Sequence, residues 1–97
     1  MPSNKKGRCD PYLYFQRTPG SKKVRLVQLF RDHTPSEEKI AEAVSRMEKA
    51  AEGEHPKREP ITIRKLTGGK YLVVDGNTTT TVMRQWGCTH IIAIEIE

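Results

Sequence analysis

The sequence predicts a small α+β domain in which the elements follow the order strand, helix, strand, strand, helix, strand. Two observations predict it. One segment places apolar residues at spacings of three and four, as the buried side of a helix requires, and short apolar runs bounded by glycine or proline indicate strands. The chain has 97 residues, of which 35% are apolar and 30% charged. These values suit one domain with a core of modest size.

The first half of the domain is expected to contain one strand and one helix. Residues 24–30, VRLVQLF, are too apolar for a surface loop and predict a strand. Thr34 is the expected helix cap, with Pro35 in the first helical position and Glu37 completing a capping box. We expect Gly53 to end this helix. The helix carries one apolar stripe, formed by Ile40, Ala43, Val44 and Met47.

The second half is expected to contain a hairpin, a short helix and a closing strand. Residues 61–66, ITIRKL, alternate as in a half-buried strand, and TGGK then forms a turn into the partner strand, residues 71–74. Residues 77–86 are expected to be helical, and residues 90–96, HIIAIEI, close the chain as a strand.

The four consecutive threonines, residues 78–81, allow a second interpretation. The pair Asp75 and Gly76 is a strong hairpin signal and threonine favours strands, so this interpretation pairs YLVV with TTTTV across the turn DGN. Against this, the residues from Met83 onward do not alternate, and Gly87 is a natural helix terminator. Pattern alone leaves the two interpretations equal.

The formal net charge of +5 resides entirely in residues 1–23, which we expect to form a basic, partly flexible arm before a domain of residues 24–97. This arm contains one acid and six bases: Lys5, Lys6, Arg8, Arg17, Lys22 and Lys23. Tyr12, Tyr14 and Phe15 lie among them. Cations that pair with phosphates, beside rings that stack on bases, favour contact with nucleic acid. The alternative is a disordered tail whose rings fold back on the domain.

Several classes of protein and site are disfavoured. No stretch approaches the roughly 18 apolar residues of a membrane span, and the N-terminus lacks an apolar signal core. Cys9 and Cys88 are too few for a disulfide framework, so we expect a cytoplasmic protein with both thiols reduced. The three histidines and two cysteines show no metal-ligand spacing, and no metal site is expected.

Residues 24–97 resemble the N-terminal domain of ParB, the chromosome-partitioning protein, and its relative sulfiredoxin. In that family an opening strand precedes a helix, and a phrase of the form P-I-V-V-R begins a hairpin; here the phrase is PITIRKLTGGKYLVVDGN, residues 60–77. A glycine-containing loop, a helix, a second glycine and a closing strand follow, and Gly76, the threonines, Gly87 and HIIAIEI take these places. The resemblance implies a ParB/sulfiredoxin-like fold with a mixed sheet, and it favours the helix for the threonines.

The resemblance also implies a phosphate site where this second helix begins. Backbone N–H groups at a helix N-terminus suit phosphate oxygens, and threonine hydroxyls add donors. The expected phosphate or nucleotide site comprises Gly76, Asn77, Thr78, Thr79 and Thr80. ParB-like proteins carry an acid and arginines after the glycine and bind a nucleoside triphosphate, whereas sulfiredoxin carries a cysteine, a histidine and an arginine. This motif has neither the cysteine nor the arginines, so sulfiredoxin's reaction is not supported.

The charges near this loop bear on phosphate binding. Asp75 repels phosphate unless a magnesium ion or a basic neighbour offsets it. Lys70 and Arg84 are within reach in sequence, and Lys57 and Arg58 extend a basic face. In the alternative interpretation there is no ligand: Asn77 caps the helix and the hydroxyls bond nearby carbonyls.

Three functions follow from these observations. The first is a ParB-like binding module with a phosphate-accepting loop, whose basic arm contacts nucleic acid. The second is a small nuclease or nucleotide hydrolase, for which Asp75 is the candidate catalytic group. The third is a protein-interaction domain that has lost the ligand. The cofactor stays open, with a nucleoside triphosphate and Mg²⁺ as candidates; no membrane partner is expected, and the oligomeric state is open.

Overall fold

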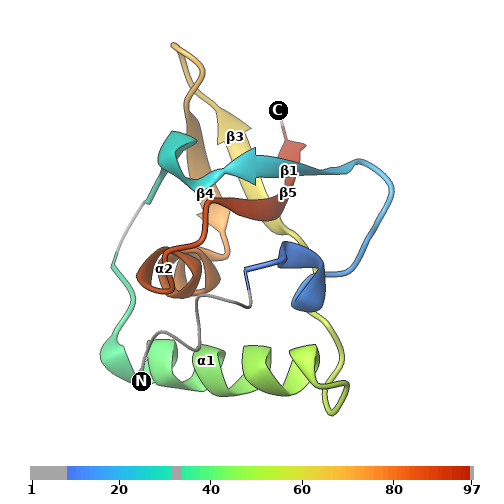
Figure 1. Ribbon diagram of the computed structural model, residues 1–97. Helices are drawn as coiled ribbons and strands as arrows, with labels where there is room; N and C mark the ends of the chain where they lie inside the picture. Colours follow the sequence, from blue (N-terminus) through green and yellow to red (C-terminus); the bar gives the residue numbers. More distant parts are fainter. Residues whose placement is uncertain (1–8, 32–33, 97) are drawn as a thin grey trace.

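A computed structural model of the protein describes residues 9–31 and 34–96. One sheet lies above two helices: α2, Asn77–Gln85, packs between the sheet and α1, Glu37–Ala51 (Figure 1). The strands are β1 Ser21–Arg25, β2 Leu29–Phe30, β3 Ile61–Lys65, β4 Tyr71–Asp75 and β5 His90–Ile96. Two 3-10 helices complete the described elements, η2 Pro11–Leu13 and η3 Leu26–Gln28. The predicted α+β class is confirmed.

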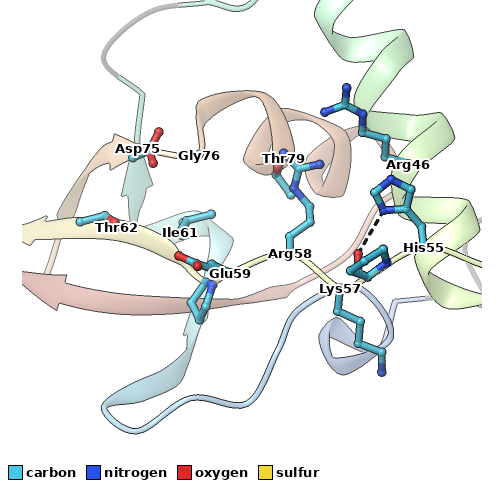
Figure 2. Close-up of a pocket in the computed structure, with 12 residues that line it drawn as sticks. Arg46, His55, Lys57, Arg58, Glu59, Ile61, Thr62, Asp75, Gly76 and Thr79 are labelled. Carbon is cyan, nitrogen blue, oxygen red and sulfur yellow. Dashed lines mark hydrogen bonds between the residues drawn. The ribbon is translucent and has the colours of Figure 1, made fainter. Parts of the chain in front are cut away.

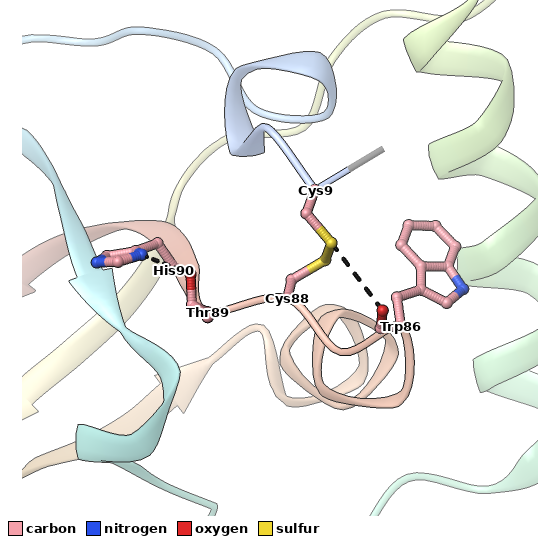
Figure 3. The surroundings of a disulfide bond; sticks show 5 residues. All are labelled: Cys9, Trp86, Cys88, Thr89 and His90. Atoms are coloured by element: carbon pink, nitrogen blue, oxygen red, sulfur yellow. Dashed lines mark hydrogen bonds between the residues drawn. A yellow bond between two sulfur atoms is a disulfide. The ribbon is translucent and has the colours of Figure 1, made fainter. Parts of the chain in front are cut away.

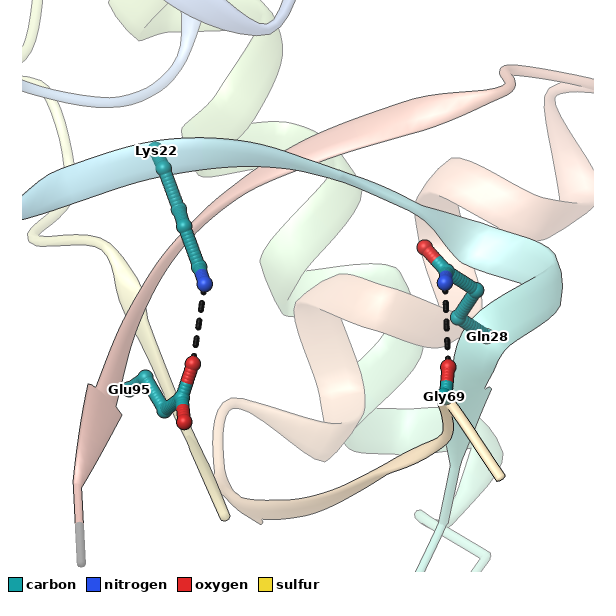
Figure 4. Close-up of polar contacts among 4 residues, drawn as sticks. All are labelled: Lys22, Gln28, Gly69 and Glu95. Atoms are coloured by element: carbon teal, nitrogen blue, oxygen red, sulfur yellow. Dashed lines mark hydrogen bonds and ion pairs between the residues drawn. The ribbon is translucent and has the colours of Figure 1, made fainter. Parts of the chain in front are cut away.

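The sheet is mixed and has the strand order β1-β5-β3-β4-β2. β1 is antiparallel to β5 and β3 to β4, whereas β5 is parallel to β3 and β2 to β4. Because η3 joins β1 directly to β2, one stretch of chain supplies both edges and the sheet curls (Figure 1). The Gln28 side-chain amide donates a hydrogen bond to the Gly69 carbonyl oxygen at 3.0 Å, which ties η3 to the hairpin turn (Figure 4).

The first strand differs from the prediction. Residues 24–30 do not form one strand, because η3 separates β1 from β2. Val24, Leu26 and Leu29 are all buried. In a straight strand, successive side chains point to opposite faces, so Leu29 would lie on the face opposite to Val24 and Leu26. The turn of η3 directs Leu26 and Leu29 into the core and leaves Val27 74% exposed.

The start of α1 also differs from the prediction. The cap is Ser36, not Thr34, and its Oγ accepts a hydrogen bond from the Lys39 N–H at 3.3 Å. Capping by Ser36 places two glutamates in the first turn, where the helix dipole favours negative charge. The apolar stripe is confirmed, with Ala43 and Met47 buried. Gly53 follows the helix in the left-handed conformation, as expected.

The threonine segment is helical, as the family resemblance predicted. α2 begins after Gly76, which has φ 108°, and Gly87 follows it with φ 78°. The alternative hairpin between YLVV and TTTTV is therefore wrong. The partner of β4 is β3, and the predicted TGGK turn joins them.

The described part of the expected arm is folded onto the domain. Tyr14 and Phe15 are each 1% exposed and belong to the core. β1 crosses the expected boundary between residues 23 and 24. The rings of Tyr14 and Phe15 are thus folded back, as in the alternative considered for this segment, and they cannot stack on bases. Lys5, Lys6 and Arg8 lie outside the described residues.

Cys9 and Cys88 form a disulfide across 79 positions of sequence, with their Cα atoms 5.2 Å apart. The expectation of two reduced thiols is therefore wrong. A count of cysteines does not show that the fold brings the N-terminal segment beside the residue that follows Gly87. Cys88 is buried, as expected for it. None of the helices within residues 9–31 and 34–96 has the length and apolar character needed to cross a bilayer.

Candidate functional site

A cavity of about 440 Å³ opens where α2 begins (Figure 2). Gly76 and Thr79 supply one wall, and Asp75 at the end of β4 lies beside them. Residues 55–60, which we call the connector, form the opposite wall, and Arg46 reaches the cavity from α1. Three segments far apart in sequence therefore meet at the first turn of α2.

Gly76 sets the shape of this corner. Its φ of 108° is a conformation that L side chains rarely adopt, and an added Cβ would lie 2.4 Å from Cγ2 of Ile61. The backbone at the start of α2 consequently lies directly against β3. The first turn of α2 therefore borders the cavity, and the N-terminus of a helix is favourable for an anion.

The threonine hydroxyls have different roles. Thr80 Oγ1 donates to the Gly76 carbonyl oxygen and Thr81 Oγ1 to the Asn77 carbonyl oxygen, each at 2.9 Å. These two hydroxyl hydrogens are used inside the helix, as the alternative interpretation proposed. Among the threonines, Thr79 lines the cavity. Asn77 is 5% exposed and Thr78 is half-buried.

Arg58, in the connector, is the cation that faces α2. Figure 2 shows its guanidinium pointing from the connector toward Thr79. Burial lowers the pKa of Arg58 below the ordinary arginine value, the charge of Arg46 lowers it further, and Asp75 opposes both effects. The cavity therefore contains a partly desolvated positive charge, which gains most from an anionic partner.

The backbone of Arg58 is fixed by the N-terminal segment. The Arg58 N–H donates to the Tyr14 carbonyl oxygen, and the Gln16 N–H donates to the Arg58 carbonyl oxygen, each at 2.8 Å. Phe15, between these two partners, forms a parallel bridge with Arg58. Sequence reasoning placed Arg58 on a basic face only, because nothing local shows that it lies opposite a helix that begins 19 positions later in the chain.

Lys70 and Arg84, which are close in sequence to the start of α2, lie away from the cavity. Arg84 donates to the carbonyl oxygens of Leu26, at 2.9 Å, and Leu29, and burial followed by the charge of Arg31 lowers its pKa. Lys70 Nζ lies 5.2 Å from the centroid of the Phe30 ring. Neither residue is part of the cavity wall.

The described cations of the expected nucleic-acid surface are separate from the cavity. Lys22 forms an ion pair with Glu95 at 2.8 Å (Figure 4). The Arg17 guanidinium lies 3.7 Å from the centroid of the Tyr12 ring, and Lys23 Nζ lies 5.7 Å from it. Arg17 and Lys23 thus gather on one ring, whereas Lys22 is engaged with an acid.

Within the described residues, no cluster of three histidine, cysteine or acidic side chains is arranged for a metal ion. Two carboxylates, Asp75 and Glu59, line the cavity. Their oxygens are of the kind that a phosphate-bound Mg²⁺ takes as ligands. The arrangement is suited to holding an anion between α2 and Arg58, with Asp75 at its side.

Comparison with known proteins identifies the fold of the chain. No protein-family model matches the chain, and no curated protein matches it. Solved structures do match: sulfiredoxin from Arabidopsis thaliana superposes with a TM-score of 0.63 at 14% identity, over 81% of this chain and 86% of that chain. The chain has a ParB/sulfiredoxin-like fold. The predicted resemblance is confirmed at the level of fold.

Two further structures of this fold contain nucleotides. The C-terminally truncated ParB from Caulobacter crescentus, complexed with CTP-γ-S, matches with a TM-score of 0.56 at 18% identity, over 80% of this chain and 44% of that chain. A free serine kinase variant in complex with ADP matches with a TM-score of 0.68 at 13% identity, over 87% of this chain and 34% of that chain. The present chain thus spans about a third of the length of the serine kinase.

Proposed function

We propose that this ParB/sulfiredoxin-like domain is a binding module that holds the phosphate groups of a nucleotide in the cavity between α2 and the connector. The observation that carries the proposal is the position of Arg58. Its guanidinium points toward Thr79 in the first turn of α2. A helix N-terminus and a partly desolvated arginine are each favourable for phosphate oxygens, and here they face the same space.

The charges around the cavity support an anionic ligand. Asp75 alone would repel phosphate, as the sequence indicated. Arg46 and Arg58 line the same cavity and offset that carboxylate. Because Arg46 also lowers the pKa of Arg58, the two cations repel each other, and an anion between them would relieve this repulsion.

The nucleotide class of ligand is supported by the bound molecules of the structural relatives. The serine kinase variant holds ADP, and the ParB structure holds CTP-γ-S. We propose a nucleotide for this chain too, with its phosphates at the start of α2, beside Gly76, Asn77, Thr78 and Thr79. Thr80, which the sequence also placed in the site, supports the turn through its bond to Gly76.

An NMR titration with ATP, CTP and GTP, with and without Mg²⁺, tests the proposal. We expect chemical-shift changes at residues 75–79 and at Arg58. The variant Arg58→Met should weaken binding about tenfold or more, since a hydrogen bond to a charged group contributes about 1.5–3 kcal/mol. Arg64→Met is the matched control, because Arg64 lies on β3 outside this cavity. Equal effects of the two variants, or no shifts with any of the three nucleotides, would contradict the proposal.

We also propose that the N-terminal basic residues contact nucleic acid, through Arg17 and Lys23 and through Lys5, Lys6, Arg8 and Lys22. The gathering of two cations on the Tyr12 ring supports this surface. Gel-shift assays with single-stranded DNA and RNA should show binding that weakens steeply as salt rises. The double variant Arg17→Gln, Lys23→Gln should bind more weakly, whereas Lys49→Gln on α1 should not. Absence of binding at low salt removes this part of the proposal.

A second candidate function, a small nuclease or nucleotide hydrolase, is favoured by one observation. Asp75 lines the cavity, where a carboxylate can act as a general base. Hydrolysis of ATP or of single-stranded DNA that stops in Asp75→Asn, while ATP binding persists, would support it. Turnover that survives this substitution excludes the mechanism. Binding of neither nucleotide nor nucleic acid would leave the protein-interaction domain as the remaining hypothesis.

A further inference from the structure

The disulfide joins the residue after the end of α2 to the N-terminal segment that holds the backbone of Arg58. Cys88 directly follows Gly87 at the end of α2, and Cys9 begins the described N-terminal segment (Figure 3). A Cys9 sulfur lies 4.0 Å from the Trp86 carbonyl oxygen. Cys88 is 8% exposed, whereas Cys9 is half-buried and therefore the more exposed residue of the pair.

A short path of contacts leads from the disulfide to Arg58. Residues 9–16 run from Cys9 through η2 to Gln16, and the Asp10 carboxylate caps η2 by accepting from the Tyr12 N–H at 3.0 Å. The Tyr14 ring then packs 5.4 Å from the Trp86 ring. The path ends in the pair of 2.8 Å backbone hydrogen bonds that hold Arg58.

We propose that the disulfide between Cys9 and Cys88 is a redox latch that controls ligand binding in the cavity. The inference rests on the proposed phosphate-binding function. In the oxidised protein, one covalent bond ties α2 to the segment that holds the Arg58 backbone, so the two walls of the cavity are fixed relative to each other. Reduction removes this tie and leaves the segment held by packing and hydrogen bonds, and Arg58 is then less well positioned.

The chemical step is thiol–disulfide exchange with a dithiol. A thiolate of the reductant attacks one sulfur of the disulfide, and we expect attack at Cys9, the more exposed residue of the pair. The second thiol of the reductant then closes its own disulfide. Two electrons and two protons pass to the protein, the bond between Cys9 and Cys88 breaks, and both residues become thiols. An oxidised dithiol leaves as the product.

The experiment compares ATP binding by the oxidised protein and by the same protein reduced with dithiothreitol. We expect the reduced protein to bind ATP about fivefold or more weakly, a modest coupling between two sites. Amide hydrogen exchange should accelerate at Arg58 and Gln16 on reduction. The double variant Cys9→Ser, Cys88→Ser should behave as the reduced protein does and should not respond to dithiothreitol. In Arg58→Met, reduction should change ATP affinity far less, because the latch acts through that side chain.

Each other outcome has a distinct meaning. Equal ATP affinity in the oxidised and reduced proteins overturns the latch and leaves the proposed function standing. Failure of the oxidised protein to bind any of ATP, CTP and GTP overturns the proposed function and the latch with it. Loss of the whole tertiary structure on reduction, seen by circular dichroism, also overturns the latch, because the inference requires a local release within a folded domain.

Discussion

Gly76 decides whether the corner between β4, α2 and β3 can exist. Its positive φ and its contact with Ile61 act together: the first restricts the backbone to a conformation that favours glycine, and the second leaves no volume for a methyl group. Gly69, in the hairpin turn, has a similar φ of 75° with no atom near its missing Cβ. A substitution at Gly69 therefore introduces backbone strain alone, whereas a substitution at Gly76 introduces backbone strain and steric overlap.

We expect Gly76→Ala to lower the free energy of unfolding by more than Gly69→Ala does. The strain of a positive φ costs about 1–2 kcal/mol in either variant, and overlap with Ile61 adds about 1–3 kcal/mol in the first. Urea unfolding monitored by circular dichroism measures the difference. Equal losses in the two variants would mean that β3 yields to the methyl group at no cost.

Lys22 and Glu95 provide a test of surface electrostatics. Hydrogen bonding between them raises the pKa of Lys22 and lowers that of Glu95. The Glu95 contribution to stability is thus present above the ordinary glutamate pKa and is lost as pH falls through the lowered value. The Lys22 contribution is lost as pH rises through its raised pKa.

We expect Lys22→Gln to raise the pKa of Glu95 toward its ordinary range. An NMR titration of the Glu95 carboxyl carbon measures this shift. The control is Lys23→Gln, since Lys23 lies over the Tyr12 ring and should leave the Glu95 titration unchanged. An unchanged Glu95 titration in Lys22→Gln would show that the ion pair is absent in solution.

At the scale of the element, two neighbouring hydroxyl residues, Thr34 and Ser36, are candidates to cap α1. Ser36 accepts from the Lys39 N–H, whereas Thr34 lies two residues before it. We expect Ser36→Ala to lower the free energy of unfolding by about 1 kcal/mol and Thr34→Ala to change it little. Thermal unfolding of both variants checks the assignment. A larger loss in Thr34→Ala would restore the cap that the sequence predicted.

The threonines of α2 divide by the side of the helix on which they lie. Both Thr79 and Thr80 are buried, but Thr79 lines the cavity, whereas the Thr80 hydroxyl donates to the Gly76 carbonyl oxygen. We expect Thr79→Val to weaken ATP binding with little change in stability. Thr80→Val should lower the free energy of unfolding by about 1 kcal/mol, the contribution of one hydrogen bond, with a smaller change in affinity. ATP titration and urea unfolding of both variants measure the contrast, and the reverse pattern would contradict these roles.

At the scale of the whole molecule, the disulfide closes a loop that contains most of the chain. Cross-linking residues 79 positions apart restricts the unfolded state, and in the chain-entropy model such a loop contributes about 4.5 kcal/mol. We expect the reduced protein to remain folded with a free energy of unfolding lower by about 2–4 kcal/mol. Urea unfolding with and without dithiothreitol measures this. An unchanged midpoint would mean that the two sulfurs are not joined in solution.

The elements that the sequence predicted correctly are those whose signals lie within a few residues of one another. The stripe of Ala43 and Met47, the TGGK turn and the stop at Gly53 each follow from local spacing or backbone preference. Apart from the two thiols, which are joined across 79 positions, the predictions that were wrong concern choices between near-equal local options. Thr34 and Ser36 are both suitable residues for capping α1. The segment from Val24 to Phe30 bends so that Val24, Leu26 and Leu29 all reach the core.

The sequence by itself determined the element order, the helix at the threonines once the family resemblance was considered, and the glycine on which that helix begins. The tertiary structure alone decided that Arg58 faces α2, that Tyr14 and Phe15 belong to the core, and that Cys9 meets Cys88. The physical reason is that periodicity and backbone preference depend on neighbours along the chain. Positions of side chains across a cavity depend instead on how the whole sheet curls and on what then packs against it.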